Sequence, residues 1–472
     1  MSNNYSQYLK HPVFKVASQI VTEQNLEAYV IGGFVRDLIL ERPSKDIDIV
    51  VIGNGLDLAK ACADKLRVKK VSVFERFGTA QFVYKDLEVE FVGARKESYR
   101  SDSRKPTIEN GTLQDDQNRR DFSINALAIS LHKDNFGDLI DPFGEMEDIE
   151  NEIIRTPLEP AKTYSDDPLR MMRAIRFATQ LDFKIERKSL EAISENAHRL
   201  EIISQERIMD ELNKIILSKT PSRGFKLLNS TKLLHQFFPE MIALQGIETR
   251  DGKSHKDNFY HTLQVLDQAC EKTNDLWVRW AAILHDIAKP PTKRFVPGDG
   301  WTFHGHEDKG SRMVKPIFKR LKLPLGENMR KVVNLVKLHL RPIALTKEYI
   351  TDSAVRRIIF DADQDLEDLM ILCKSDITTK NKKKEEQFQA NLLNVESNIA
   401  AVEERDRIRN WQPPIGGEEI MKIFGIGPSK EIGAIKTKLK DAILDGDITN
   451  DYTEAYKFVH QLGKELGLQS NE

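Results

Sequence analysis

Two short stretches decide the fold of the first third of the chain: Ala28-Tyr29-Val30-Ile31-Gly32-Gly33-Phe34-Val35-Arg36-Asp37 and Lys45-Asp46-Ile47-Asp48-Ile49-Val50-Val51. Residues 28–31 are apolar and predict a short buried strand that ends at the two glycines. A helix is expected from Phe34 to Leu40 and a second strand from Asp46 to Ile52. Further strands are expected at 78–83 and 87–92, with a helix at 13–28. We therefore predict a small mixed α/β domain over residues 1–155.

Asp46 and Asp48 are separated by one residue, so on a strand their side chains point to the same face. Two carboxylates this close repel each other and raise each other's pKa, a cost that a bound divalent cation relieves. Oxygen ligands together with substrate phosphates favour Mg²⁺. A lone pair of this kind also fits an ordinary exposed strand edge. The order of a strand, Gly-Gly, a helix and an Asp-x-Asp strand is a more specific signal than the aspartate pair alone.

The Gly32-Gly33 pair and the helix after it have the composition of a phosphate-binding turn. Backbone N–H groups approach phosphate closely where side chains are absent, although a Gly-Gly pair alone is simply a turn. Arg36 adds a fork-shaped phosphate donor, and Asp37 is placed to orient it.

The chain has 472 residues, which suggests about three domains. Hydrophobic residues make up 40 % and charged residues 31 %, and the net charge is −2. This balance argues against a globally basic nucleic-acid binder, but 71 Lys and Arg still allow a local basic groove. We find no signal peptide and no membrane-length apolar stretch. Cys62, Cys270 and Cys373 are far apart in the sequence, which fits the reducing cytoplasm.

From about Pro157 onward the periodicity is helical, with almost no strand signal after residue 155. The run from Asp166 to Arg176 opens one helix, where Asp167 is expected as N-cap before Pro168. Capping alone would explain that aspartate. Three arginines, however, recur on nearly one helix face and suit a triphosphate and an RNA backbone: Arg170, Arg173 and Arg176.

Histidine is concentrated between residues 255 and 339, which hold six of the eleven in the chain. One histidine in an apolar helix is usually an ordinary core residue. Here imidazoles recur together with carboxylates, and mixed ligands of this kind suit a transition metal. The residues concerned are His261, His285, Asp286, His306, His339 and Asp376.

The glycine turn with Asp46 and Asp48 resembles the head of the nucleotidyltransferase superfamily. More narrowly, it resembles the bacterial and eukaryotic class of tRNA nucleotidyltransferases and the related bacterial poly(A) polymerases. The resemblance implies that the two aspartates hold two Mg²⁺ ions, one activating the RNA 3′-hydroxyl and one steadying the triphosphate. Glu90 matches the position of the third carboxylate loosely.

Further matches extend to residue 211. The run Arg119-Arg120-Asp121-Phe122-Ser123-Ile124-Asn125-Ala126 is similar to the family's second motif, which implies that Arg120, Asp121 and Asn125 bind ribose and brace the head. A helix-capping Arg–Asp pair remains the alternative. The polar stretch 98–117 resembles the flexible loop that switches from C to A addition.

The arginine run resembles the family's Glu-Asp-x-x-Arg template, with Asp166 in place of the usual Glu. The resemblance implies that Asp167 and Arg170 pair with the base edge of CTP or ATP. The family's neck is also matched by a later run, Ser204-Gln205-Glu206-Arg207-Ile208-Met209-Asp210-Glu211. We interpret this run as a capped helix with Arg207 and Glu211 paired at i, i+4.

The order His261, His285-Asp286, Asp376 looks like the HD phosphohydrolase superfamily, and His306 and His339 stand where two-metal members carry extra ligands. Imidazole ligands favour Mn²⁺, Co²⁺ or Ni²⁺ there. Fusion of an HD unit to such a head is known in bacteria and favours a tRNA enzyme over a poly(A) polymerase.

We therefore expect an α+β protein: a nucleotidyltransferase head (1–155), an RNA-binding helical neck (156–235), an HD domain (236–380) and a helical tail that grips tRNA (381–472). Gly425-Ile426-Gly427-Pro428-Ser429-Lys430 in the tail is either a backbone-binding turn or a plain joint between helices. The expected activity is addition of C, C and A to the tRNA 3′ end in the cytoplasm, without membrane contact. Partial CC- or A-adding enzymes, a poly(A) polymerase and an inactive RNA-binding module remain alternatives, and the oligomeric state stays open.

Overall fold

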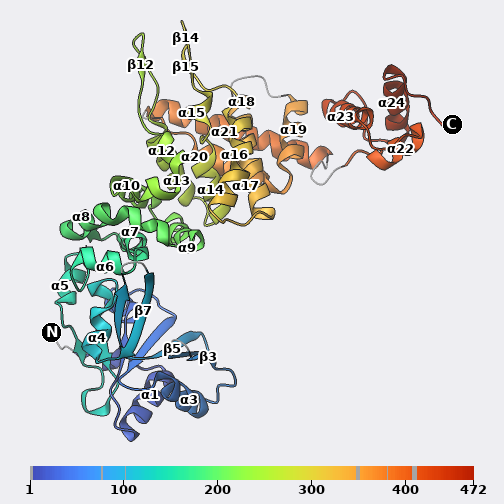
Figure 1. Ribbon diagram of the computed structural model, residues 1–472. Coiled ribbons are helices and arrows are strands. Elements are labelled where there is room, and N and C mark those ends of the chain that lie inside the picture. The colour runs from blue at the N-terminus through green and yellow to red at the C-terminus, as the bar shows by residue number, and fades with distance from the viewer. Residues whose placement is uncertain are drawn as a thin grey trace. The chain divides into compact units, whose positions relative to one another are not determined.

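The computed structural model describes residues 4–75, 78–100, 103–346, 351–379, 381–406 and 412–471, with backbone only for 97–100, 103–108, 382 and 406. It comprises two compact units, Met1–Pro239 and Glu240–Glu472, which are described separately below (Figure 1). The head and neck expected from the sequence fall in the first unit. The HD domain and tail fall in the second.

A seven-stranded mixed sheet forms the centre of the first unit. Its order is β3 (Ser72–Phe74), β4 (Thr79–Tyr84), β5 (Leu87–Gly93), β2 (Asp46–Val51), β1 (Ala28–Ile31), β8 (Ala128–Ser130) and β9 (Leu139–Ile140). The pair β2–β5 is parallel, and the other neighbouring pairs are antiparallel. The predicted mixed α/β domain is confirmed.

The pleat of β2 separates polar from apolar side chains as the sequence predicts. Ile47, Ile49 and Val51 are at most 1 % exposed, whereas Asp46 is exposed and Asp48 is partly exposed. Two amphipathic helices, α1 (Pro12–Glu23) and α3 (Gly55–Leu66), pack against each other, and α3 also packs on β4 and β5 (Figure 1). Burial of the apolar face thereby directs both aspartates away from these helices.

The remaining helices of this unit are short and follow the sheet or build the neck. They are α2 (Gly33–Ile39), α4 (Leu113–Asn118), α5 (Glu145–Glu150), α6 (Pro160–Asp166), α7 (Leu169–Leu181), α8 (Arg187–Asn196), α9 (Gln205–Ile216), α10 (Pro221–Ser230), α11 (Leu233–Phe237) and α12 (Pro239–Ala243), which crosses into the second unit. The polar stretch 98–117, expected as a loop, lies in the hairpin β6 (Arg95–Arg100)–β7 (Ser103–Asn110) and in α4, with residues 101 and 102 outside the described part.

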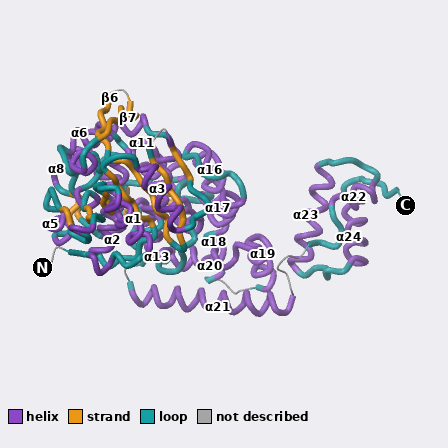
Figure 2. The backbone as a smooth tube through the Cα atoms, turned by 90° about the horizontal axis from the view of Figure 1, so that it is seen from below, coloured by secondary structure: helices purple, strands orange, loops and turns teal. Residues whose placement is uncertain are grey.

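The second unit is helical. Its helices are α13 (Asn258–Cys270), α14 (Leu276–Leu284), α15 (Lys289–Thr292), α16 (His306–Arg320), α17 (Glu327–Leu338), α18 (Leu340–Leu345), α19 (Asp352–Ala362), α20 (Leu366–Ser375), α21 (Lys382–Asp406), α22 (Gly417–Phe424), α23 (Lys430–Asp445) and α24 (Tyr452–Glu465). The charge run at 382–386 begins the long helix α21, which stands out in Figure 2. No helix among the described residues combines the length and apolar character needed to cross a bilayer.

The expectation of a mostly helical chain with almost no strand after residue 155 is confirmed, with a few very short strands as the exception. β10 (Ile153–Ile154) pairs with β11 (Lys184–Ile185), and two hairpins follow: β12 (Thr249–Arg250)–β13 (Lys253–Ser254) and β14 (Arg294–Val296)–β15 (Gly300–Thr302). Strands of two or three residues are too short to produce a recognisable alternation.

The tail forms its own small core from α22, α23 and α24. Gly425 ends α22 with φ of 62°, a left-handed conformation that glycine adopts without strain, and the Ser429 side chain caps α23. The segment 425–430 therefore has the geometry of a joint between two helices.

Candidate functional sites

A polar cavity of about 490 Å³ lies over the exposed ends of β2 and β5. The nucleotidyltransferase residues expected from the sequence meet in its lining: Gly33, Arg36, Asp46, Asp48, Glu90, Arg120, Asp121, Asn125, Arg173 and Arg176. Residues up to 143 positions apart are thus brought to one site (33 to 176).

The carboxylates of this cavity are crowded by the strand register. Asp46 is opposite Glu88 and Asp48 is opposite Glu90 in the parallel pair β2–β5. Burial raises the pKa of Asp48, with a further contribution from Asp46, while Arg120 opposes the rise. Burial and the charge of Asp48 likewise raise the pKa of Glu90. An all-carboxylate donor set with crowded negative charge fits Mg²⁺.

Gly32 separates β1 from α2 and provides space rather than a phosphate donor. Its N–H donates to the Leu127 carbonyl at 3.2 Å, so this group is already used. A Cβ at this position would lie 2.7 Å from Arg120 Nη1 and 3.1 Å from Asp48 Oδ2. With φ of 86°, the position also favours glycine. Gly32 therefore lets Arg120 approach Asp48.

Arg36 is fixed in the cavity as its sequence neighbour predicts. Its Nε and Nη2 donate to the two oxygens of Asp37, both at 2.9 Å. Its Nη1 donates to Asn125 Oδ1 at 2.7 Å, and the guanidinium lies over the Phe177 ring. This bidentate clamp holds a cation at the edge of the site.

Sequence analysis missed Asp116, which is fully buried in the first turn of α4. Its two oxygens accept from Arg119 and from Arg120, with Arg120 Nη2 at 3.2 Å. Burial opposes ionisation, yet Arg120 and Arg119 lower the pKa of Asp116 below its ordinary value. The i, i+3 and i, i+4 spacing to the two arginines was the available signal.

Asp121 joins the head to α7. Its Oδ2 accepts from Arg173 Nε at 2.6 Å, and its Oδ1 accepts from Asn125 Nδ2 at 3.0 Å. Burial opposes the charge, but Arg173 and Asn125 lower the pKa of Asp121 to about 2. These contacts are those of a brace, the second of the two roles implied by the resemblance.

A second cavity, of about 310 Å³, shares Asp48, Glu90 and Arg120 with the first and is also lined by Asp167 and Arg170. The expected template residues therefore lie next to the carboxylates. Arg170 Nη2 donates to the Arg119 carbonyl at 2.5 Å.

The N-cap prediction for Asp167 was displaced by one position. Helix α7 begins at Leu169, and Pro168 occupies its N-cap position. Asp167 Oδ1 still accepts from the Leu169 N–H at 3.2 Å. One carboxylate oxygen thus makes a cap-like contact.

Arg176 and Glu211 form an ion pair at 2.7 Å between α7 and α9. Both are largely buried, and Arg176 also lies 4.1 Å from the centre of the Phe177 ring. The prediction of an Arg207–Glu211 pair was wrong, because within the described part of the chain Glu211 pairs with Arg176 instead. The Ser204 side chain makes no capping hydrogen bond. The long-range partner takes the carboxylate because α7 packs directly on α9.

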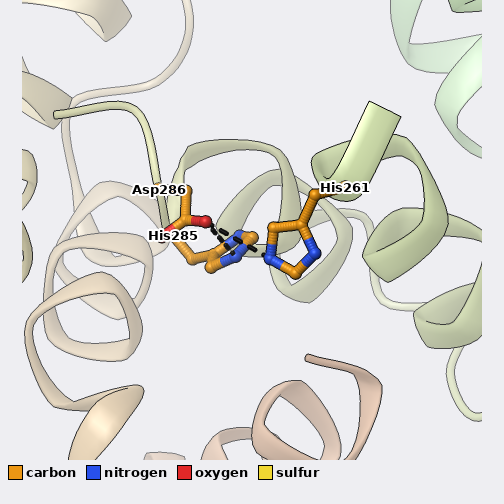
Figure 3. A group of neighbouring side chains, drawn as sticks. All are labelled: His261, His285 and Asp286. Carbon is orange, nitrogen blue, oxygen red and sulfur yellow. Dashed lines mark ion pairs between the residues drawn. The ribbon is translucent and has the colours of Figure 1, made fainter. Parts of the chain in front are cut away.

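In the second unit, all six predicted metal ligands converge. His261 Nε2 lies 3.3 Å from Asp286 Oδ2 and 3.0 Å from Asp376 Oδ1. His285 follows the end of α14, and its Nε2 lies 3.3 Å from Asp286 Oδ2 (Figure 3). His306 Nε2 is 3.2 Å from Asp286 Oδ1. Two groups could each hold an ion: His261, His285 and Asp286, and Asp286, His306 and His339.

The histidine tautomers can be assigned from their backbone contacts. The Nδ1 atoms of His285, His306 and His339 lie 2.7–2.8 Å from carbonyl oxygens, which can only accept. Nδ1 therefore carries the hydrogen, and Nε2 presents its lone pair to the cluster. These three Nε2 atoms are buried without a hydrogen-bond partner. Buried nitrogen atoms that have no hydrogen-bond partner and surround a shared carboxylate fit a metal centre.

The charges in this cluster are strongly coupled. Burial opposes the charge on His285, yet Asp286 and Asp376 raise its pKa to about 10, so a metal ion would have to displace a proton from Nε2 before using its lone pair. Burial and the charge of His285 lower the pKa of His339 to about 4. Lys289, which sequence analysis missed, places Nζ 2.6 Å from Asp286 Oδ2. Its i+3 position after Asp286 was the only sequence signal.

A cavity of about 700 Å³ opens beside the candidate metal ligands His261 and Asp376. Its other walls carry cationic and aromatic side chains: Lys253 of β13, Trp301 of β15, Lys289 of α15, and His255, Lys256 and Phe303 from the segments that follow the two hairpins.

Comparisons with known proteins agree with this geometry. Residues 28–155 match the "Poly A polymerase head domain", residues 182–244 the "Probable RNA and SrmB- binding site of polymerase A", and residues 258–377 the "HD domain".

The chain is 32 % identical over 363 residues to the A-adding tRNA nucleotidyltransferase of Deinococcus radiodurans, covering 75 % of this chain and 80 % of the relative. It is 30 % identical over 392 residues to the multifunctional CCA protein of Nitrosococcus oceani, covering 80 % and 91 %. A solved structure described as a CCA-adding enzyme in apo form I superposes with a TM-score of 0.61 at 25 % identity, covering 95 % of this chain and 93 % of that one. The matched segments and the two relatives show that this chain belongs to the class II tRNA nucleotidyltransferases, with a poly(A) polymerase-type head, an RNA-binding region and an HD domain.

Proposed function

We propose that the first unit adds C, C and A to the 3′ end of tRNA from CTP and ATP. The observation that carries this proposal is the shared cavity wall, in which Asp48 and Glu90 lie between the phosphate-binding arginines and the template pair Asp167 and Arg170. The relatives include both A-adding enzymes and multifunctional CCA proteins at similar identity, so the extent of addition is part of the proposal.

Asp46, Asp48 and Glu90 would hold Mg²⁺, which when bound neutralises phosphate charge and activates the attacking hydroxyl. Arg36 and Arg120 line the same cavity and donate to triphosphate oxygens. The clamp from Asp37 fixes Arg36 before substrate arrives, so little ordering is lost on binding. Asp121 keeps α7 against the head, which holds the template at a constant distance from the carboxylates.

Base choice is assigned to Asp167 and Arg170. A carboxylate accepts from the exocyclic amine of C or A, and an arginine donates to ring acceptors. G and U place an oxygen where that amine would be, which leaves two acceptors facing each other. Sites that hydrogen-bond their substrate reject such mismatches by up to ~10⁴-fold.

The extent of addition is tested with three tRNA primers: one lacking CCA, one ending in C and one ending in CC. Each is incubated with one labelled nucleoside triphosphate at a time. A CCA-adding enzyme uses CTP on the first two primers and ATP on the third. Activity on the CC primer alone indicates an A-adding enzyme, and ATP polymerisation on any RNA indicates a poly(A) polymerase.

We propose that the HD unit hydrolyses phosphoesters, including 2′,3′-cyclic phosphates at damaged RNA ends. His261, His285, Asp286 and Asp376 would hold one Mn²⁺, Co²⁺ or Ni²⁺ ion, and His306 and His339 would join Asp286 around a second. Such ions supply an activated hydroxide when bound. The lysines of the adjoining cavity attract the phosphate. We place the protein in the cytoplasm, where its three free cysteines stay reduced.

The HD proposal is tested by measuring the metal content of the purified protein and hydrolysis of 2′,3′-cyclic AMP across Mg²⁺, Mn²⁺, Co²⁺ and Ni²⁺. We expect bound transition metal and hydrolysis with at least one of the last three ions. A metal-free protein that is inactive with every ion would make the unit a structural spacer.

A further inference from the structure

A separate groove lies along α16 and α17 of the second unit, with a volume of about 1000 Å³. The two helices pack side by side (Figure 1). The residues that line the groove do not include the ligands of the metal cluster or the residues lining the cavity beside it.

Cationic side chains dominate the charge of this groove. Its lining holds the five cations Arg312, Lys315, Arg330, Lys331 and Lys337, against two carboxylates, Glu327 and Asp365. The local balance of five positive and two negative charges is +3, in a chain whose net charge is −2. Positive charge is therefore concentrated in this groove.

Four of these cations are available to a ligand. Lys331 is neutralised by Asp275 and Asp368, at 2.7 and 2.6 Å. The other four are exposed, and within the described part of the chain none of them has an ion pair: Arg312, Lys315, Arg330 and Lys337. Asp365 is occupied by Asn334 Nδ2 at 3.1 Å, so it opposes an anion less than a free carboxylate would.

The spacing of the cations fits a chain of phosphates better than a single anion. Arg330 and Lys337 lie seven residues apart on α17, which is about 10 Å along the helix axis. Arg312 and Lys315 are about 4.5 Å apart along α16 by the same measure. One strand of a DNA duplex advances about 3.4 Å of helix axis per phosphate, which sets the scale for a nucleic-acid backbone. On this scale the row on α17 spans about three phosphate steps and the row on α16 about one.

From this arrangement we propose that the α16–α17 groove binds the phosphate backbone of the tRNA substrate. The choice of tRNA rests on the proposed function of the first unit, and the groove itself requires only a phosphate chain. It gives an electrically near-neutral protein a local site for a polyanion.

The test measures binding of tRNA lacking CCA, without CTP or ATP, at several NaCl concentrations. Two charge-reversed variants are compared, Arg312→Glu with Lys315→Glu and Arg330→Glu with Lys337→Glu. The matched control is Lys319→Glu with Lys322→Glu, which changes the same charge at exposed lysines outside the groove lining. Thermal melting verifies that each variant folds.

We expect each groove variant to weaken tRNA binding at least tenfold at about 0.1 M salt, and the control less than threefold. The slope of log Kd against log salt should fall by about 2 for two lost phosphate contacts, at about 0.9 per contact. Equal effects of groove and control variants, or a wild type that does not bind tRNA, would overturn the proposal. Wild-type binding without nucleotide addition would contradict the proposed function alone. Inorganic tripolyphosphate competing as well as tRNA would reassign the groove to small anions and overturn the RNA assignment.

Discussion

Asp48 on β2 and Glu90 on β5 are direct register partners across a parallel pair of strands. Each is partly buried, and each has a raised pKa because of burial and a neighbouring carboxylate. Glu88 is their exposed neighbour, opposite Asp46. Burial favours Glu90 over Glu88 as the third carboxylate that the sequence suggested only loosely, and this role stays a prediction.

Removing the carboxylates should abolish nucleotide addition. We expect Asp46→Ala and Asp48→Ala to reduce the rate by at least roughly 10²–10³-fold, because phosphate charge is no longer neutralised. Glu90→Gln should reduce the rate and raise the Mg²⁺ concentration needed, whereas Glu88→Gln should do so much less. Rates are measured against Mg²⁺ with tRNA lacking CCA. Appreciable addition by a folded Asp48→Ala protein would refute the assignment.

Base selection should depend on the carboxylate of Asp167. Asp167→Ala should admit UTP or GTP relative to CTP and ATP, and Arg170→Ala should lower the use of both correct nucleotides. Asp167→Ser is the control for the cap-like contact to Leu169, since serine also caps helices but lacks the carboxylate. If Asp167→Ala lowers only the melting temperature, and Asp167→Ser restores it with nucleotide choice unchanged throughout, the helix-cap interpretation is correct.

The two units should be chemically separable. Asp286→Ala should release metal and abolish hydrolysis of 2′,3′-cyclic AMP, because both candidate metal groups share this carboxylate. CCA addition should stay within about twofold of wild type. Asp46→Ala should do the reverse. His304→Ala serves as control, since His304 is exposed and lies outside the clusters. Loss of both activities in Asp286→Ala would contradict independence.

Asp121 should contribute stability that disappears in acid. Its folded pKa of about 2 lies below the ordinary 3.8, so its contribution is complete above about pH 4 and is lost as pH falls toward 2. The difference corresponds to about 2 kcal/mol, of which roughly 1 kcal/mol is lost by pH 3. Asp121→Asn should therefore unfold more easily than wild type at pH 7, by a margin that shrinks at pH 3. Denaturant unfolding checks this, with exposed Asp210→Asn as control; a margin independent of pH would be inconsistent with the pKa.

The sequence was most informative where local pattern sets structure. Alternation in 46–51 correctly predicted a buried face and an aspartate face, and the Arg36–Asp37 clamp follows from adjacency. Contacts set by tertiary packing were not predictable in this way. Arg176 takes Glu211 from α9, and Asp116 orients two arginines from a stretch expected to be a loop. The hairpins beside the HD cavity were missed because their strands are too short to show a period.

The proposal of full CCA addition is tested most directly by sequencing product ends. Wild-type protein is incubated with tRNA lacking CCA, an equal mixture of all four nucleoside triphosphates and Mg²⁺, and the 3′ ends are read. Our account predicts that the products end in CCA, with addition stopping there and with U and G nearly absent. Products ending in CC, products extended only by A, or tails of many A residues would contradict it.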